Sequence, residues 1–342
     1  MATSGAPAKR RGRFTAAFVI GLLTTLVGSE LAVRASAGRL SEPQIYFSGP
    51  AQTAIHDMDV LAAAGITSDI TFVGTSFVRR GIAADRFEGK FADSDYVHNL
   101  ALPGAQTPVV ERWLLDEVVP RLHPKRVVWG VSSIDFNAGR PNRTIEQYLD
   151  ARASEPGWIA ALDRALLSIA LSEHRDELRD PASLIEAARG NRERFTRQRP
   201  LGRRAVWDLG FRDLSDAQLD RMRENHRITV RDKQLVNFRV GDEELNAFRR
   251  TLRALREQGI EVVVVVMPIP TSFRELHPGG PEQFEELRDL VLAESEAAGV
   301  DALDLSSSMD DDDFRDYEHL EVEAAEEFSD LLADRLRALG WR

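Results

Sequence analysis

The chain has 342 residues, of which 43% are hydrophobic and 29% are charged, and its formal net charge at pH 7 is −11. This composition excludes an intrinsically disordered protein, and the acidic balance argues against a general nucleic-acid binder, which needs a basic face. The absence of cysteine excludes disulfides, thiolate catalysis and cysteine-ligated metal sites. The length suits one α/β domain with insertions or two small domains.

The N-terminal part combines a basic stretch with an apolar one. An uncharged run at 14–29 is ended by Glu30 and preceded by four basic residues, Lys9, Arg10, Arg11 and Arg13. We predict a cytoplasmic basic tail at 1–13, a transmembrane signal anchor at 14–34 and a linker at 35–65, with the rest of the protein outside the cell membrane. Two alternatives stay open. One is a secreted protein, cleaved from a signal peptide near Ala35-Ser36-Ala37, and the other is a buried cytoplasmic helix.

From residue 66 onward, apolar runs typical of strands alternate with segments of helical periodicity. Predicted strands lie at 70–73, 96–101, 126–131, 260–267 and 300–305, and predicted helices at 51–64, 108–119, 242–258, 281–298 and 321–339. The run Val262–Val266 shows no alternation, as expected of a strand buried on both faces. This order predicts an α/β fold with a flavodoxin-like, doubly wound, five-stranded parallel sheet.

Polar residues follow the carboxyl ends of four of these strands, where ligands bind in doubly wound sheets. Ser76, Gly104 and Ser132 follow the first, second and third strands, and Asp316 and His319 follow the fifth. A carboxylate three residues before a histidine can orient the ring of a general base. Each of these residues taken alone also fits a turn or a helix cap. Their joint placement favours a catalytic site.

Four short blocks carry a resemblance to a known family. Gly74-Thr75-Ser76, Asn99 to Gly104, Gly130 to Asp135, and Asp316 to His319 resemble, in this order, the four blocks of SGNH (GDSL-type) hydrolases. The resemblance covers 66–137 and 242–340, and we take 66–137 and 242–342 as the catalytic domain. Thr75 stands where the family usually has Asp, and Ser132 stands where an Asn donates to the oxyanion.

The resemblance implies a role for each block. Ser76 would be the nucleophile, His319 the base and Asp316 its orienting acid, with an oxyanion hole at Ser76, Gly104 and Ser132. Removal of one oxyanion donor costs about 2.7–4 kcal/mol of transition-state stabilisation, so slow hydrolysis, acyl transfer and loss of activity all stay open. Further possible substrate contacts are Thr75, Asn99, Ser133 and His277, the last in the loop after the fourth strand.

The implied function is that of an anchored serine esterase or O-acyltransferase acting on an ester of cell-envelope material. The family members that this chain resembles most have one N-terminal anchor, and they include proteins that resemble alginate acetylation factors and teichoic-acid D-alanylation factors. The expected partners are an acylated small molecule or polysaccharide, the membrane and envelope-assembly proteins, but no nucleic acid. We expect no cofactor and no metal. The alternatives are a catalytically weak, glycan- or partner-binding subunit of an envelope-assembly complex and an unrelated flavodoxin-like binding domain.

Residues 138–241 form a predicted helical, Arg-rich insertion between the third and fourth strands. Helical patterns lie at 144–153, 158–171 and 182–189, and six arginines cluster behind them, at Arg192, Arg194, Arg197, Arg199, Arg203 and Arg204. Its position above the rim of the sheet predicts a lid that binds an anionic glycan or lipid head group. The alternative is a solvated basic loop.

Overall fold

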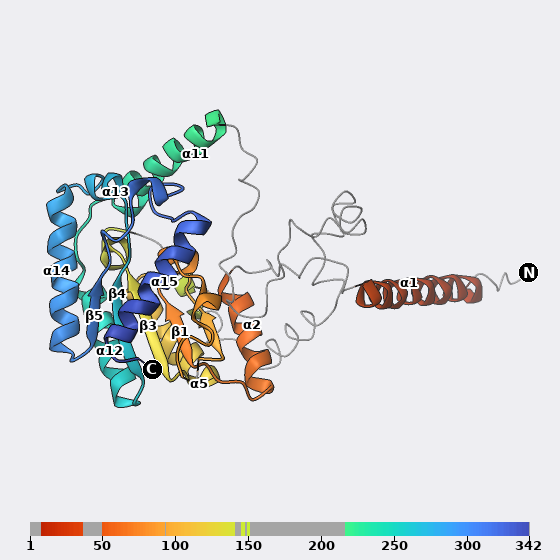
Figure 1. Cartoon of the computed structure of the whole chain (residues 1–342). Helices are drawn as coiled ribbons and strands as arrows, with labels where there is room; N and C mark the ends of the chain where they lie inside the picture. Colours follow the sequence, from red (N-terminus) through yellow and green to blue (C-terminus); the bar gives the residue numbers. More distant parts are fainter. Residues whose placement is uncertain are drawn as a thin grey trace, which may run out of the picture. The chain divides into compact units, whose positions relative to one another are not determined.

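The computed structural model describes residues 8–36, 50–92, 94–140, 145–147, 149–150 and 216–341. The chain divides into two compact units. One comprises Met1–Tyr46 and Glu155–Arg197, and its described part is the single helix α1 (Ala8–Ser36). The other comprises Phe47–Ser154 and Gln198–Arg342 and contains the sheet (Figure 1).

The sheet has five parallel strands in the order β2-β1-β3-β4-β5. Their bounds are β1 Ile70–Val73, β2 Val97–Asn99, β3 Arg126–Val131, β4 Glu261–Val266 and β5 Asp301–Asp304. The order reverses between β1 and β3, which is the topological switch point of a flavodoxin-like sheet. The predicted parallel, doubly wound sheet is confirmed.

The central strands are buried because both of their faces carry apolar side chains. β4 supplies the run Val262–Val266, all buried, and β3 pairs with it from Arg126↔Glu261 to Val131↔Val266. A strand buried on both faces needs apolar residues at successive positions, and β-branched valine fits the pleated sheet well. The uninterrupted valine run was therefore a reliable signal.

The five predicted helices 51–64, 108–119, 242–258, 281–298 and 321–339 are found at bounds close to those predicted. The helices of the sheet-containing unit are α2 Pro50–Ala63, α3 Ser76–Gly81, α4 Thr107–Arg112, α5 Val119–Leu122, α11 Asp216–Thr229, α12 Asp242–Glu257, α13 Thr271–Glu275, α14 Pro281–Ala297 and α15 Val322–Ala338. A π-helical segment, η3 (Trp113–Val118), joins α4 to α5, so the predicted helix 108–119 runs on to Leu122. The C-terminal helix α15 packs against α3, where Ser329 Oγ accepts the Ala83 N–H at 2.9 Å.

Some parts of the structure differ from the predictions or do not test them. The helices α3, α11 and α13 were not predicted, and α13 lies in the segment 270–280 that was expected to be a loop. The predicted helices 158–171 and 182–189, most of 144–153 and the arginine cluster lie outside the described residues. Among the helices that the structure describes, none is both long and apolar enough to cross a membrane, so the transmembrane helix predicted at 14–34 is not found.

Candidate active site

The turn between β1 and α3 places Ser76 at the carboxyl end of the central sheet. Gly74 has φ +142°, and a Cβ there would lie 2.3 Å from the Gly130 carbonyl oxygen, so only glycine fits. Thr75 follows as the buried N-cap residue, and Ser76 is the first, partly exposed residue of α3. A strand, a tight turn and a helix thus present the predicted nucleophile at the rim of the sheet.

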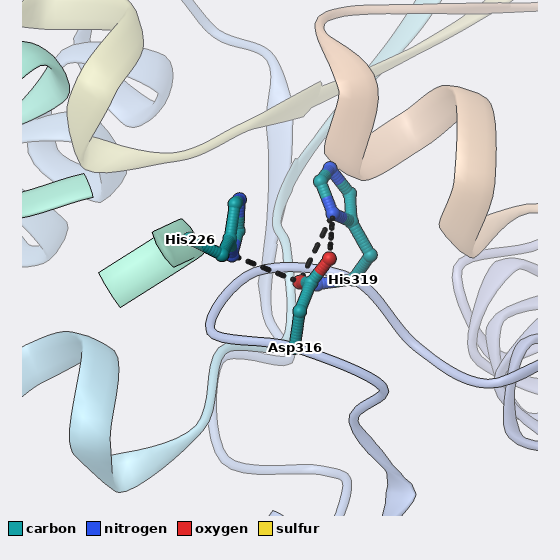
Figure 2. Close-up of side chains that lie close together, drawn as sticks. All are labelled: His226, Asp316 and His319. Atoms are coloured by element: carbon teal, nitrogen blue, oxygen red, sulfur yellow. Dashed lines mark hydrogen bonds and ion pairs between the residues drawn. The ribbon is translucent and has the colours of Figure 1, made fainter. Parts of the chain in front are cut away.

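The loop between β5 and α15 holds Asp316 and His319 in a fixed relation. Asp316 Oδ1 accepts the backbone N–H groups of Glu318 and His319, each at 2.8 Å. The imidazole Nδ1 of His319 lies 2.9 Å from Oδ2 and 3.0 Å from Oδ1 of Asp316 (Figure 2). An ionised carboxylate only accepts hydrogen bonds, so Nδ1 carries the proton and Nε2 carries the lone pair. Asp316 therefore orients the ring and selects the tautomer of a general base.

The Nε2 atom of His319 is the free end of this pair. It is buried and has no hydrogen-bond partner among the described residues. The ring lies against α3, with its centroid 6.0 Å from that of Phe77, and Arg80 Nη1 is 3.4 Å from Nδ1. Within the part of the chain that the structure describes, no hydrogen bond joins Ser76 Oγ to this Nε2. Catalytic hydrogen bonds are often long without substrate, so the arrangement still fits a nucleophile and its base.

The Asp316 carboxylate is held in its charged form. Burial alone would raise the pKa of Asp316, but the charge and hydrogen bond of His319 lower it, as do the charge of His226 and the N–H of Glu318. The pKa of Asp316 consequently lies below its ordinary value. An acid that stays ionised can stabilise the imidazolium formed when His319 takes a proton.

The predicted oxyanion side is less completely hydrogen-bonded. Gly104 has φ +84°, a conformation that favours glycine, at the turn after β2. The Ser132 N–H donates to Asp135 Oδ2 at 2.7 Å, so this N–H is already used. The Ser132 hydroxyl is buried and faces the Asp135 backbone N–H as in a capping box, but it forms no well-aligned hydrogen bond among the described residues. That hydroxyl is therefore the group of Ser132 that we predict to serve an oxyanion.

Asp135 lies behind this hydroxyl and is fully buried. Burial raises the pKa of Asp135 to about 7, although the Ser132 N–H, the charge of Arg140 and the hydroxyls of Ser132 and Thr75 all lower it. The hydroxyls of Ser132 and Thr75 are near enough to lower the pKa of Asp135, yet neither forms a well-aligned hydrogen bond in the described part of the chain. Asp135 Oδ1 also has no hydrogen-bond partner there. Asp135 is thus a carboxyl group that changes its charge near neutral pH beside the nucleophile turn.

The side chains of Asn99, Ser133 and His277, which were also predicted as substrate contacts, form hydrogen bonds within the protein. The Asn99 amide donates to the carbonyls of Val78 (2.9 Å) and Ile82 (3.0 Å) at the end of α3. Ser133 Oγ lies 2.9 Å from His277 Nε2, and both residues are buried. Asn99 therefore ties α3 to β2, and the Ser133–His277 pair ties β3 to the loop after α13.

The residue that sequence reasoning missed is His226, from α11. Its Nε2 lies 2.8 Å from Glu318 Oε2, and its Nδ1 lies 3.5 Å from Asp316 Oδ1 (Figure 2). Glu318 is buried and also accepts a hydrogen bond from Gln234 at 3.1 Å. His226 lies 90 residues before Asp316 and belongs to no recognisable motif, so no local sequence pattern predicted this contact.

The same cluster contains the donor atoms for a metal ion. One ligand atom from each of His226, Asp316 and His319 lies within 4.8 Å of the other two. The sequence showed no metal-ligand spacing because these donors come from two segments far apart in the chain. Asp316 forms a hydrogen bond with His319 and an ion pair with His226, so these two contacts are explained without an ion.

The sequence of the chain matches no protein-family profile, and no curated protein matches it. Solved structures do match. A candidate acylhydrolase from Bacteroides fragilis is 11% identical, with a TM-score of 0.43, over 82% of this chain and 94% of that one. A carbohydrate acetylesterase from Sinorhizobium meliloti is 12% identical, with a TM-score of 0.35, over 80% and 100%. An aryl esterase from M. smegmatis is 13% identical, with a TM-score of 0.36, over 80% and 100%. Likeness at this level assigns no family, so function rests on the site itself.

Proposed function

We propose that the chain is a serine esterase or O-acyltransferase that works through Ser76, His319 and Asp316. The observation that carries the proposal is the asymmetric bonding of His319. Its Nδ1 is bound by Asp316, and its buried Nε2 has no partner within the described residues, against the helix that begins at Ser76. A nucleophile, a base with a free nitrogen and an orienting acid are the three parts that acyl transfer requires.

The proposed reaction has two steps. Ser76 Oγ attacks an ester carbonyl while His319 Nε2 takes the hydroxyl proton, and the leaving alcohol then takes that proton as the carbonyl–oxygen bond breaks. The Ser76 and Gly104 N–H groups and the Ser132 hydroxyl receive the negative charge on the carbonyl oxygen. In the second step, water or a sugar hydroxyl attacks the acyl–Ser76 ester while His319 Nε2 takes its proton, and this proton returns to Ser76 Oγ as the acyl–Oγ bond breaks. Water gives hydrolysis, and a sugar hydroxyl gives acyl transfer.

The test uses a fluorophosphonate probe, which modifies an activated serine. We expect the full-length chain to be labelled, and Ser76→Ala and His319→Ala to lose the label. The control Ser308→Ala removes a serine whose hydroxyl is bonded to Leu305 O at 2.8 Å, so it keeps the label. Labelling that persists in Ser76→Ala would overturn the assignment of the nucleophile.

The second candidate function is a catalytically weak subunit that binds a glycan or a partner protein. Two observations favour it: Ser132 in place of an amide donor, and no hydrogen bond between Ser76 and His319 within the described segments. Absence of labelling in the full-length chain, together with binding of an acylated polysaccharide, would favour this candidate over an enzyme.

The proposed location is the outer side of the cell membrane, with an ester of cell-envelope polysaccharide as substrate. The basic residues before position 14 support it, as do the exposed apolar side chains of α1, among them Phe18, Ile20 and Leu31. Separation of membranes from soluble material, with and without residues 1–34, tests this proposal. Equal amounts in the soluble fraction for both chains would overturn membrane attachment.

A further inference from the structure

We propose that His226 is a positioning residue of the catalytic pair, so that helix α11 of the insertion completes the active site. The inference rests on the proposed function, since it assigns His226 a role in the same triad. His226 would act through Asp316 and would not touch the reacting atoms.

The geometry places His226 between two carboxylates. Its Nε2 is 2.8 Å from Glu318 Oε2, and its Nδ1 accepts the Tyr317 backbone N–H at 3.3 Å and lies 3.5 Å from Asp316 Oδ1. Its ring centroid is 5.7 Å from that of His319. Asp316 Oδ1 thus lies between the two imidazoles, while Oδ2 contacts His319 (Figure 2). By holding the loop at Tyr317 and Glu318, His226 keeps the Asp316 carboxylate in the orientation that serves His319.

The charges around His226 raise its pKa, although the hydrogen bond from the Tyr317 N–H to Nδ1 needs the neutral ring. Burial alone would lower the pKa of His226, but the hydrogen bond to Glu318 and the charges of Asp316 and Glu318 outweigh burial and raise it. The opposing charge is that of Arg80, from α3, which lowers it, while His319 faces the ring from the same loop as the two carboxylates. On α11 itself, Arg227 is paired with Glu224 at 2.7 Å.

Glu318 shows why a hydrogen-bond donor is needed at this point. It is buried, one of its oxygens has no partner among the described residues, and the other receives His226 Nε2 and Gln234 Nε2. A buried carboxylate is costly unless it is paired. The loop that carries Asp316 and His319 therefore also contains a second buried acid, Glu318, and α11 supplies its partner, His226.

The kinetic experiment compares three variants in the full-length chain. His226→Ala removes the ring, His226→Gln keeps a donor for Glu318 without the charge, and the control Arg227→Ala removes a charge from the same helix. We expect kcat to fall by up to about 10²-fold in His226→Ala, with KM unchanged, because a misplaced catalytic group slows chemistry without weakening substrate binding. Arg227→Ala should stay within twofold of the wild type.

The pH profile separates positioning from simple packing. Loss of a positive charge beside the pair should move the acid limb of the kcat/KM profile to higher pH in both His226 variants, even where His226→Gln keeps the thermal stability. Unchanged acid limbs in both variants would overturn the proposal. So would a loss of kcat in Arg227→Ala equal to that in His226→Ala.

A titration by NMR tests the pairing without any enzymatic activity. In protein with labelled histidine, we expect the titration midpoint of His226 to fall in Glu318→Gln and in Asp316→Asn. If wild-type protein proves inactive while these midpoints move, the proposed function fails and the ion-pair cluster stands. Midpoints that do not move would overturn the positioning role, as would stoichiometric zinc in the purified protein, which would make the cluster a metal centre.

Discussion

The two sides of the candidate site differ in how completely they are hydrogen-bonded. On the base side, Asp316 accepts hydrogen bonds from two backbone N–H groups and from His319 Nδ1, and it also forms an ion pair with His226. On the oxyanion side, the buried hydroxyls of Thr75 and Ser132 and one oxygen of Asp135 have no partner among the described residues. Buried polar groups are nearly always paired, and exceptions need an explanation. The proposed base is thus held in place without substrate, whereas the proposed oxyanion side has buried polar groups without well-aligned partners among the described residues.

The largest expected effect comes from breaking the base side. Asp316→Asn should lower kcat by roughly 10⁴-fold, because an amide can hold His319 in the wrong tautomer. Ester hydrolysis measured with Asp312→Asn as the control checks this, since Asp312 is an exposed carboxylate of the same loop. Equal losses in the two variants would mean that charge in the loop, and not the Asp316–His319 pair, drives the reaction.

A smaller loss is expected on the oxyanion side. Ser132→Ala should lower kcat/KM by about 10–10²-fold, because it removes one hydroxyl donor while the Ser76 and Gly104 N–H groups remain. The control is Ser295→Ala, which deletes a buried hydroxyl bonded to Val291 O at 2.8 Å in α14, far from the sheet rim. Unchanged activity in Ser132→Ala would remove Ser132 from the oxyanion hole.

A pH-dependent difference in stability should come from Asp135. Its pKa is raised from 3.8 to about 7, so between these values the folded protein binds a proton that the unfolded chain has lost. The contribution of Asp135 to stability is therefore present below pH 4 and is lost as pH rises toward 7, by at most about 1.4 kcal/mol per pH unit. Asp135→Asn should gain stability relative to wild type across this range. Urea unfolding at pH 5, 6, 7 and 8 measures the difference, and a constant difference would contradict the expectation.

A stability effect alone is expected from the glycine beneath the nucleophile turn. A Cβ at Gly130 would lie 2.3 Å from Val78 Cγ2 and 2.7 Å from Met267 Sδ, so Gly130→Ala should cost about 1–3 kcal/mol. Gly28→Ala in α1, where nothing lies within 4 Å, is the matched control. Equal melting temperatures for Gly130→Ala and wild type would show that α3 moves aside without cost.

The sheet was predictable because its signals are local. The run Val262–Val266 and the strand Ile70–Val73 are indicated by apolar and β-branched residues, and both match the observed strands within one residue. The Asp316–His319 pair was also predictable, since His319 follows Asp316 by three positions. The partnership of His226 with Glu318 was not, because it depends on how a segment 92 residues earlier docks on the loop. The burial of Asn99, Ser133 and His277 likewise follows from tertiary packing, which no spacing reveals.

The order of the active-site parts along the chain has a consequence for biosynthesis. Ser76 emerges from the ribosome about 240 residues before His319, and α15, which packs against α3, comes last of all. Strand β4 must also find β3 across more than 100 intervening residues, and such distant pairings form slowly. On the proposed function, a chain that stops before Asp316 and His319 carries Ser76 without its base. Esterase activity would then require that the segment with this pair has been made and folded.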